Sequence, residues 1–251
     1  MSELLLQTTA LTKRFGGLLV TDDVSIDVRP GEVHAIIGPN GAGKTTLINQ
    51  LSGELHADSG NVVFLGKRIT ALPIYERARR GLLRSYQITS IFEDFTVLEN
   101  TVLAAMGAKE HAFRFWKPLL GRQDLVGIAR EALDITGMTA RAEAPASQLA
   151  YGERRQLELA MTLAAQPKVL LLDEPMAGMS VQESAGVVEL LKRLKGQYSI
   201  LLIEHDMNAV FALADRITVL VYGKAMMSGT PDEIRNDPEV RAVYLGEEAN
   251  V

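Results

Sequence analysis

Cysteine is absent from this chain of 251 residues, and so are long apolar runs. Without cysteine there is no disulfide, which permits a reducing, cytoplasmic environment. The apolar runs, such as residues 169–172 and 200–203, are far shorter than the roughly 20 residues that cross a bilayer. The first residues also lack a basic start followed by a sustained apolar stretch. We therefore expect neither a membrane-spanning segment nor a signal peptide.

Positive charge is not in excess either. The 26 Lys and Arg residues are outnumbered by 31 Asp and Glu residues, and the formal net charge is -5. This balance gives no general basic surface for nucleic acid, and we interpret the local basic cluster at residues 75–84 as a solvated helix face. Long repeats and heptad arrays are also missing, which disfavours proteins built around long coiled coils. We expect no nucleic-acid partner.

The chain does carry a glycine-rich junction between a strand and a helix. Residues 33–37 have the apolar, β-branched character of a buried strand, and residues 45–51 have helical spacing of apolar side chains. The turn between them therefore lies at a helix N-terminus, where free backbone N–H groups and the helix dipole favour phosphate. Its letters, GPNGAGKT, match the Walker A pattern, with Lys44 reaching the β/γ-phosphates and Thr45 binding Mg²⁺. The alternative is a turn that only reverses the chain.

A second motif places two carboxylates at the end of an apolar run. In KVLLLDEP, residues 168–175, four apolar residues precede Asp173 and Glu174. This has the form of a Walker B strand, in which Asp173 holds Mg²⁺ and Glu174 orients or deprotonates the attacking water. An ordinary strand that ends in two solvated acids is the alternative. The two motifs support each other.

The remaining pattern predicts an α/β fold with two additions. We expect an antiparallel β layer from the early segments, a helical subdomain from the middle, and parallel crossovers from residue 168 onward. Short helices near the C-terminus begin at capping signals, Thr230-Pro231-Asp232-Glu233 and Asp237-Pro238-Glu239. The ranges are 4–15, 24–28 and 61–66 for the β layer, about 86–167 for the helical subdomain, and 230–246 for the C-terminal helices.

Residues 149–160, LAYGERRQLELA, resemble the signature motif of ABC-type ATPases. With this motif the whole chain, 1–251, reads as one ABC ATPase domain with the P-loop fold, an antiparallel β subdomain and a helical subdomain. In that family the signature glycine, matched by Gly152, and the following helix start meet the γ-phosphate held by the other subunit. A helix start that binds no ligand is the plain alternative.

The resemblance assigns further residues to an ATP and Mg²⁺ site. Phe15 resembles the aromatic residue that stacks on adenine, Gln87 the Q-loop residue near Mg²⁺, and His205 the switch histidine that contacts the γ-phosphate. The catalytic set it implies is Glu174, His205, Lys44 and Gln87, and the metal set is Thr45, Gln87 and Asp173. The implied nucleotide contacts are Phe15, Gly38, Pro39, Asn40, Gly41, Ala42, Gly43, Lys44, Thr45, Thr46, Ala150, Gly152 and Glu153.

Two positions depart from the family pattern. Ala150 stands where most ABC proteins have serine, so one hydroxyl donor to the γ-phosphate is missing. Ser180 stands where the D-loop has aspartate, which leaves open how two sites communicate. We expect reduced but real hydrolysis, with Ala150→Ser increasing turnover.

Within the family, segments such as FTVLEN (95–100) and PEVRAVYLG (238–246) resemble the ATP-binding subunits of branched-chain amino-acid, urea and amide importers. This resemblance implies a second ATPase subunit, identical or different, two transmembrane permease subunits, and indirectly a periplasmic solute-binding protein. It places the chain peripherally on the cytoplasmic face of the membrane. Residues 111–123, with the only tryptophan, are either an amphipathic contact or a cover over the core.

Three alternatives belong to other functional classes. The ATPase of a lipid-exporting ABC complex has a closely similar sequence. A nucleotide-binding regulatory subunit with weak hydrolysis is suggested by Ala150 and Ser180, although Lys44 and Glu174 are in place. A soluble ABC protein for DNA repair or translation is disfavoured by the single cassette without a coiled coil. In this family the transported solute does not need to touch the ATPase subunit, so the sequence of this chain does not identify the solute.

Overall fold

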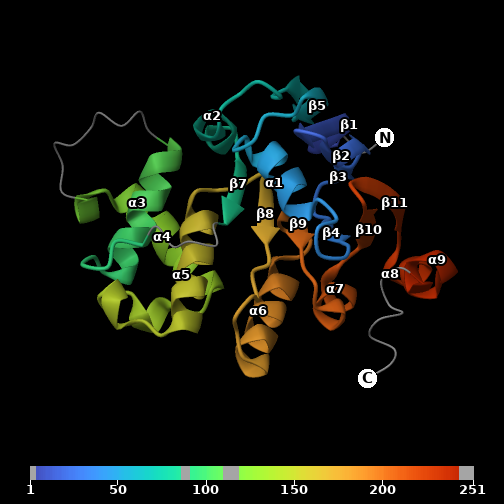
Figure 1. Cartoon of the computed structure of the whole chain (residues 1–251). Coiled ribbons are helices and arrows are strands. Elements are labelled where there is room, and N and C mark those ends of the chain that lie inside the picture. The colour runs from blue at the N-terminus through green and yellow to red at the C-terminus, as the bar shows by residue number, and fades with distance from the viewer. Residues whose placement is uncertain (1–3, 86–90, 110–118, 243–251) are drawn as a thin grey trace.

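The computed structural model describes residues 4–85, 91–109 and 119–242. Within these residues a sheet of six strands, in the order β11-β10-β4-β9-β8-β7, forms the centre of the molecule (Figure 1). Neighbouring strands are parallel except β10 and β11. Strand β4, from the first part of the chain, lies between β10 and β9, from the last part, so the central sheet combines both ends of the sequence. The strands are β4 (Val33–Ile37), β7 (Leu82–Ser85), β8 (Val169–Asp173), β9 (Ser199–Ile203), β10 (Arg216–Val221) and β11 (Lys224–Gly229).

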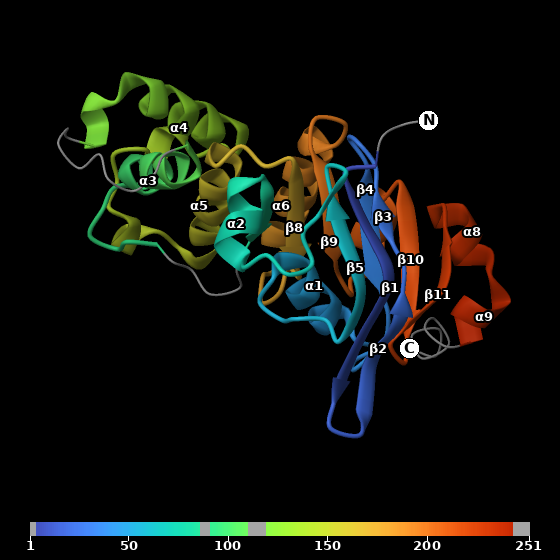
Figure 2. The ribbon, with the colours of Figure 1, turned by 90° about the horizontal axis from the view of Figure 1, so that it is seen from above.

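A second, antiparallel sheet runs beside the first, as predicted (Figure 2). Its path is β2-β1-β5-β6, and β3 pairs with β1. Helix α1 (Lys44–Ser52) buries Leu47, Ile48 and Leu51 in a core shared by both sheets. The antiparallel layer therefore supports the helix that follows the Walker A turn. Its strands are β1 (Leu6–Phe15), β2 (Leu18–Val24), β3 (Asp27–Val28), β5 (Ser59–Phe64) and β6 (Lys67–Arg68).

Helices α3, α4 and α5 contact one another and stand at one end of the molecule, away from β10 and β11 (Figures 1 and 2). They form the helical part of the predicted fold class, and α6 and α7 supply the crossovers of the central sheet. In the part of the chain that the structure describes, no helix is both long and apolar enough to span a membrane. The helices are α2 (Ile74–Arg79), α3 (Val97–Lys109), α4 (Gln123–Ile135), α5 (Tyr151–Ala164), α6 (Val181–Leu194) and α7 (Met207–Leu213), with one-turn helices at Leu119–Gly121, Thr139–Arg141 and Ala146–Gln148.

The capping signals near the C-terminus begin two short helices, α8 (Pro231–Asn236) and α9 (Pro238–Val240). Thr230 Oγ1 accepts a hydrogen bond from the Glu233 N–H, and Glu233 Oε2 accepts one from the Thr230 N–H, so the predicted capping box is formed. Ile234 and Val240 are buried in a core with α7 and β10. These helices therefore extend the central sheet's core beyond β11.

The interpretation of residues 75–84 as a solvated helix face is wrong. The helix ends at Arg79, and Leu82 begins β7, which pairs in parallel with β8. Arg77 is 1% exposed and the Arg84 side chain is 10% exposed. Both guanidinium groups point inward because they have partners there: Arg77 donates to backbone carbonyls, and Arg84 donates to carboxylate and amide oxygens.

A buried histidine joins the two sheets. His34 in β4 lies between the Asp27 carbonyl, 2.7 Å from Nδ1, and Thr218 Oγ1 of β10, 2.8 Å from Nε2. Burial, followed by the Arg216 charge, lowers the pKa of His34 from 6.5 to about 4. The imidazole is therefore neutral in the folded protein at neutral pH, with Nδ1 assigned as the donor to the carbonyl.

We expect this histidine to make folding stability depend on pH. Between pH 6.5 and about pH 4 the unfolded chain binds a proton at His34 and the folded chain does not, so stability falls as pH falls. Between pH 7 and pH 5, the free energy of unfolding of the wild-type protein should fall by about 2 kcal/mol more than that of His34→Gln, measured by urea unfolding. Equal losses in the two proteins would contradict a neutral buried imidazole.

Candidate functional site

The register of the central sheet brings three strand ends to one edge. Ile36 of β4 pairs with Ile203 of β9, and Ile203 pairs with Asp173 of β8. Because the three strands are parallel, the segments that follow Ile37, Asp173 and Ile203 leave the sheet side by side. Ligands of open α/β sheets bind at this carboxyl edge. The Walker A turn, the Walker B acids and His205 are therefore brought together, as the sequence predicts.

The Walker A turn needs glycine at two positions. A Cβ atom on Gly38 would lie 2.1 Å from the Leu220 carbonyl oxygen, and one on Gly43 would lie 2.4 Å from that of Val20. Gly43 also has φ +102°, which favours glycine. Helix α1 starts after this turn with no side-chain cap and no acidic residue in its first turn. Its first N–H groups and its dipole are thus left for an anion.

Lys44 provides the positive charge within this turn. Its buried side chain donates hydrogen bonds from Nζ to the carbonyl oxygens of Gly38, at 2.7 Å, and Pro39, at 3.1 Å. Burial lowers the pKa of Lys44, whereas the negative charges of Glu174 and Asp173 favour its charged form. Among the neighbouring predicted contacts, Asn40, Gly41 and Thr45 are exposed and Thr46 is half-buried. An arriving phosphate therefore meets an ammonium group already held by the loop.

The Walker B pair occupies the end of β8. Glu174 has φ +47°, an uncommon conformation for a residue other than glycine, and its N–H donates to the Ile203 carbonyl at 2.9 Å. Strained backbone of this kind is concentrated at functional sites. The bond to Ile203 also fixes the turn after β8 against the end of β9. Glu174 is therefore held close to the segment that carries His205.

Arg84, which the sequence analysis did not assign to the site, holds the other Walker B acid. Its Nη2 donates to Asp173 Oδ2 at 2.7 Å, and its Nη1 donates to Asn49 Oδ1 at 2.6 Å and Glu54 Oε2 at 2.9 Å. The guanidinium group thereby ties β7 and β8 to α1, the helix of the Walker A turn. The only sequence signal for a role of Arg84 in the site is its position three residues before Gln87, the predicted Q-loop residue.

The residues present fit a Mg²⁺ ion that is bound jointly with phosphate. Among the described residues, the Asp173 carboxylate accepts its hydrogen bond from Arg84 at Oδ2, and Oδ1 has no partner. Thr45 is an exposed residue at the start of α1 and carries a hydroxyl group. No cluster of three or more His, Cys, Asp or Glu side chains suited to a metal occurs in the described ranges. A few protein oxygens that supplement phosphate and water are the usual environment of this ion.

The signature segment begins α5. Ala150 is the N-cap residue, and its N–H donates to Glu153 Oε2 at 2.9 Å. Alanine has no side-chain oxygen to bond the helix in return, so only half of a capping box is formed. Ala150, Gly152 and Glu153 line a hollow of about 340 Å³ together with the start of α6, and no residue of the Walker A turn lines it. The signature residues therefore line a hollow that is separate from the Walker A turn of the same chain.

The start of α5 touches the D-loop of the same chain. The Tyr151 hydroxyl donates to the Ala177 carbonyl at 3.2 Å, and a Cβ on Gly152 would lie 2.8 Å from Glu183 Oε1. Ser180 caps α6, with Oγ accepting from the Glu183 N–H. Serine and aspartate are both good N-cap residues, so the replacement noted in the sequence leaves the helix start intact.

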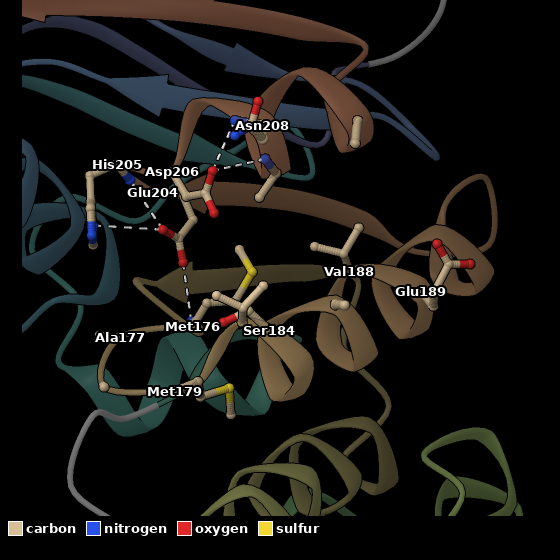
Figure 3. Close-up of a pocket in the computed structure, with 15 residues that line it drawn as sticks. Met176, Ala177, Met179, Ser184, Val188, Glu189, Glu204, His205, Asp206 and Asn208 are labelled. Atoms are coloured by element: carbon tan, nitrogen blue, oxygen red, sulfur yellow. Dashed lines mark hydrogen bonds and ion pairs between the residues drawn. The ribbon is translucent and has the colours of Figure 1, made fainter. Parts of the chain in front are cut away.

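His205 follows β9 and is exposed, with its side chain 62% accessible. Beside it, buried Glu204 accepts hydrogen bonds from the N–H groups of Met176 and His205, both at 3.1 Å (Figure 3). Burial raises the pKa of Glu204, and these two N–H groups oppose the rise. Both residues border a hollow of about 550 Å³ between α6 and α7. Sequence reasoning missed Glu204, although an acid that ends an apolar strand was its available signal.

Phe15 is the predicted adenine contact. Phe15 ends β1 with 51% of its surface exposed, and Lys13 Nζ lies 5.6 Å from its ring centre. Strand β2, which forms a hairpin with β1, passes against the Walker A turn at Val20. The role of Phe15 in adenine stacking stays a prediction. Gln87 and most of the 111–123 segment lie outside the described residues.

Taken together, these features define a P-loop nucleotide-binding cassette with a separate signature helix. Residues 21–177 match the family model of ABC transporters, and residues 227–250 match that of branched-chain amino acid ATP-binding cassette transporters. The chain therefore belongs to the ABC transporter family, as an ATP-binding ATPase cassette. The predicted family and fold class are confirmed.

Named relatives and solved structures match along nearly the whole chain. The high-affinity branched-chain amino acid transport ATP-binding protein LivG of Salmonella typhimurium is 40% identical over 98% of this chain and 100% of its own. BraF of Pseudomonas aeruginosa, with the same description, is 37% identical over the same shares. A nucleotide-free ATP-binding cassette from an ABC transporter has a TM-score of 0.83 at 31% identity, covering 96% and 98%. An ADP-bound cassette of an ABC transporter scores 0.85 at 30% identity, covering 97% and 99%.

Proposed function

We propose that this chain is the ATP-hydrolysing subunit of an importer for branched-chain amino acids or a related small polar solute. The observation that carries the proposal is the sheet edge at which Lys44, Asp173, Glu174 and His205 gather. The family match supplies ATP as the nucleotide, and the named relatives are ATP-binding proteins of branched-chain amino acid transport.

In the proposed mechanism, the phosphates lie on the α1 N-terminus with Lys44 beside them. Thr45 and Asp173 would hold Mg²⁺, which neutralises phosphate charge when it is bound, and the family resemblance adds Gln87. Glu174 orients or deprotonates the attacking water, and His205 contacts the γ-phosphate. Phe15 would stack on adenine.

The second half of each site comes from another ATPase subunit. The signature residues Ala150 and Gly152 share their hollow with α6 and not with the chain's own Walker A turn, which supports contact with the nucleotide of a partner cassette. That partner is a second copy or a related chain. The pair would be peripheral on the cytoplasmic membrane face beneath two permease subunits, with a periplasmic binding protein delivering the solute. Nucleotide-driven closure would shift the permease between states.

Transport in proteoliposomes tests this function. When the chain is reconstituted together with permease subunits, we expect ATP-dependent movement of radiolabelled leucine in the import direction, abolished by Glu174→Gln. Extraction of lipid without leucine movement would instead identify a lipid-exporting complex.

The missing hydroxyl at Ala150 gives a separate prediction. Ala150→Ser adds one hydrogen bond to a charged phosphate, so ATP turnover should rise about 10-fold. It also completes the α5 capping box, so the free energy of unfolding should rise by about 1 kcal/mol. The matched control is Ala150→Gly, which improves the N-cap but adds no donor, and should not raise turnover. Unchanged turnover in Ala150→Ser would show that the missing hydroxyl does not limit hydrolysis.

A further inference from the structure

Glu204 is a carboxylate in a place that is unfavourable for charge. It follows Ile203, the last residue of β9, a strand buried on both sides in the central sheet, and it is 1% exposed. Burying a carboxylate is costly unless hydrogen bonds or an opposite charge compensate. Within the described residues, no Lys or Arg forms an ion pair with it, and its one ionisable partner is His205. Its compensation therefore comes from the two loops that it touches.

Each oxygen of Glu204 bonds a different loop. Oε1 accepts from the N–H of Met176, in the loop after the Walker B acids, and Oε2 accepts from the N–H of His205. Oε2 also lies 3.7 Å from Nδ1 of the His205 imidazole, which is longer than a hydrogen bond, so the carboxylate acts on the ring through its charge. Figure 3 shows the carboxylate between these two segments, with His205 on one side and Met176 on the other. One side chain thus connects two of the predicted catalytic segments.

A backbone bond reinforces the same connection. The Glu174 N–H donates to the Ile203 carbonyl, so the turn from Glu174 to Met176 is bonded to the end of β9 at two points. Pro175 lies between these two points and limits the backbone freedom of the turn. The position of Glu174 relative to His205 is therefore set by bonds that include the Glu204 side chain.

We propose that Glu204 is a positioning residue, which fixes the His205 imidazole and the turn carrying Glu174 to one another. The inference rests on the proposed function, because it gives those two residues their roles. In the Nδ1–H tautomer, the imidazole directs its proton toward Glu204 and leaves Nε2 for the nucleotide. The carboxylate acts only through its neighbours and does not touch ATP.

Glu204→Gln tests this role because it keeps the side chain's size and changes what it accepts. An amide has one oxygen, so it cannot accept from both N–H groups in the wild-type arrangement, and it carries no negative charge to attract the imidazole N–H. We expect kcat for ATP hydrolysis to fall about 10- to 100-fold, as when residues that orient a catalytic ligand are changed, with KM within about 3-fold. Glu204→Asp, which keeps the charge on a shorter side chain, should retain a higher kcat than Glu204→Gln. If the amide variant does not fold, Glu204→Asp is compared with wild type in its place.

The matched control is Asp206→Asn. Asp206 lies on the other side of His205 and caps α7 through the Asn208 and Ala209 N–H groups, and asparagine is an equally good cap. Its kcat should stay within about 2-fold of wild type. Equal loss in both variants, or no loss in Glu204→Gln, would overturn the proposal.

A readout without ATP separates this proposal from the proposed function. In nucleotide-free protein labelled with ¹⁵N-histidine at pH 8, His205 should be mainly the Nδ1–H tautomer and should change to Nε2–H in Glu204→Gln. An unchanged His205 spectrum would overturn the positioning role, even in an active enzyme. If the two proteins differ in tautomer as expected but the wild-type protein has no ATPase activity, the positioning of His205 stands and the proposed function fails.

Discussion

Replacing Arg77 by methionine is expected to lower the free energy of unfolding by about 3 to 5 kcal/mol. The fully buried guanidinium group donates to four backbone carbonyls: Nε to Leu72, Nη1 to Gln50 and Leu51, and Nη2 to Thr70. Removing it leaves these buried oxygens without donors. Burial lowers the pKa of Arg77 to about 10, so the group is still charged at neutral pH.

Two of these carbonyls belong to the last turn of α1, whose C-terminal dipole favours a cation. Arg77 therefore anchors the helix whose other end forms the phosphate site. The control is Arg79→Met on the same helix, where the side chain is exposed and a change within about 0.5 kcal/mol is expected. Denaturant unfolding measures both. A difference below about 1 kcal/mol between the two variants would contradict the anchoring role.

The second large effect is expected from Glu174→Gln. Glutamine keeps the size of the side chain but cannot take a proton from water, so turnover should fall at least about 100-fold. The backbone bond from residue 174 to the Ile203 carbonyl is unaffected by the change. Removing a negative charge near the phosphates also does not weaken ATP binding, whose Kd should stay within about 3-fold.

Glu189→Gln is the control for this variant, because Glu189 is an exposed carboxylate of α6 whose side chain is 70% accessible. Its turnover and ATP affinity should match those of wild type. Retained hydrolysis in Glu174→Gln would remove the general base from the mechanism and require another group to activate water.

The parts of the site that the sequence predicts well are those encoded by short contiguous patterns. An apolar run followed by glycines, as at residues 33–43, specifies a strand and a turn without help from the rest of the chain. The same holds for the strand before Asp173 and for the caps of α8 and α9. Parallel pairing then brings the strand ends to one edge.

What the sequence did not reveal depends on partners distant along the chain. Strand β2 was missed because Asp22 and Asp23 interrupt its β pattern, and Asp23 has positive φ. From the sequence alone Arg84 is interpreted as a surface cation, because its partner Asp173 is 89 residues away along the chain. Glu204 likewise shows its link to the Walker B turn through Met176, 28 residues earlier. The roles of Gln87 and Phe15 stay predictions.

ATP turnover per chain as a function of protein concentration, for wild type and Glu174→Gln, shows whether paired cassettes hydrolyse ATP. If two cassettes complete each other's sites, the wild-type rate per chain rises with concentration and then levels off, while Glu174→Gln is inactive throughout. A chain that binds ATP but shows no turnover at any concentration would contradict hydrolysis by paired copies. It would mean that catalysis needs a different ATPase partner or the permease subunits, or that the chain is a nucleotide-binding regulatory subunit.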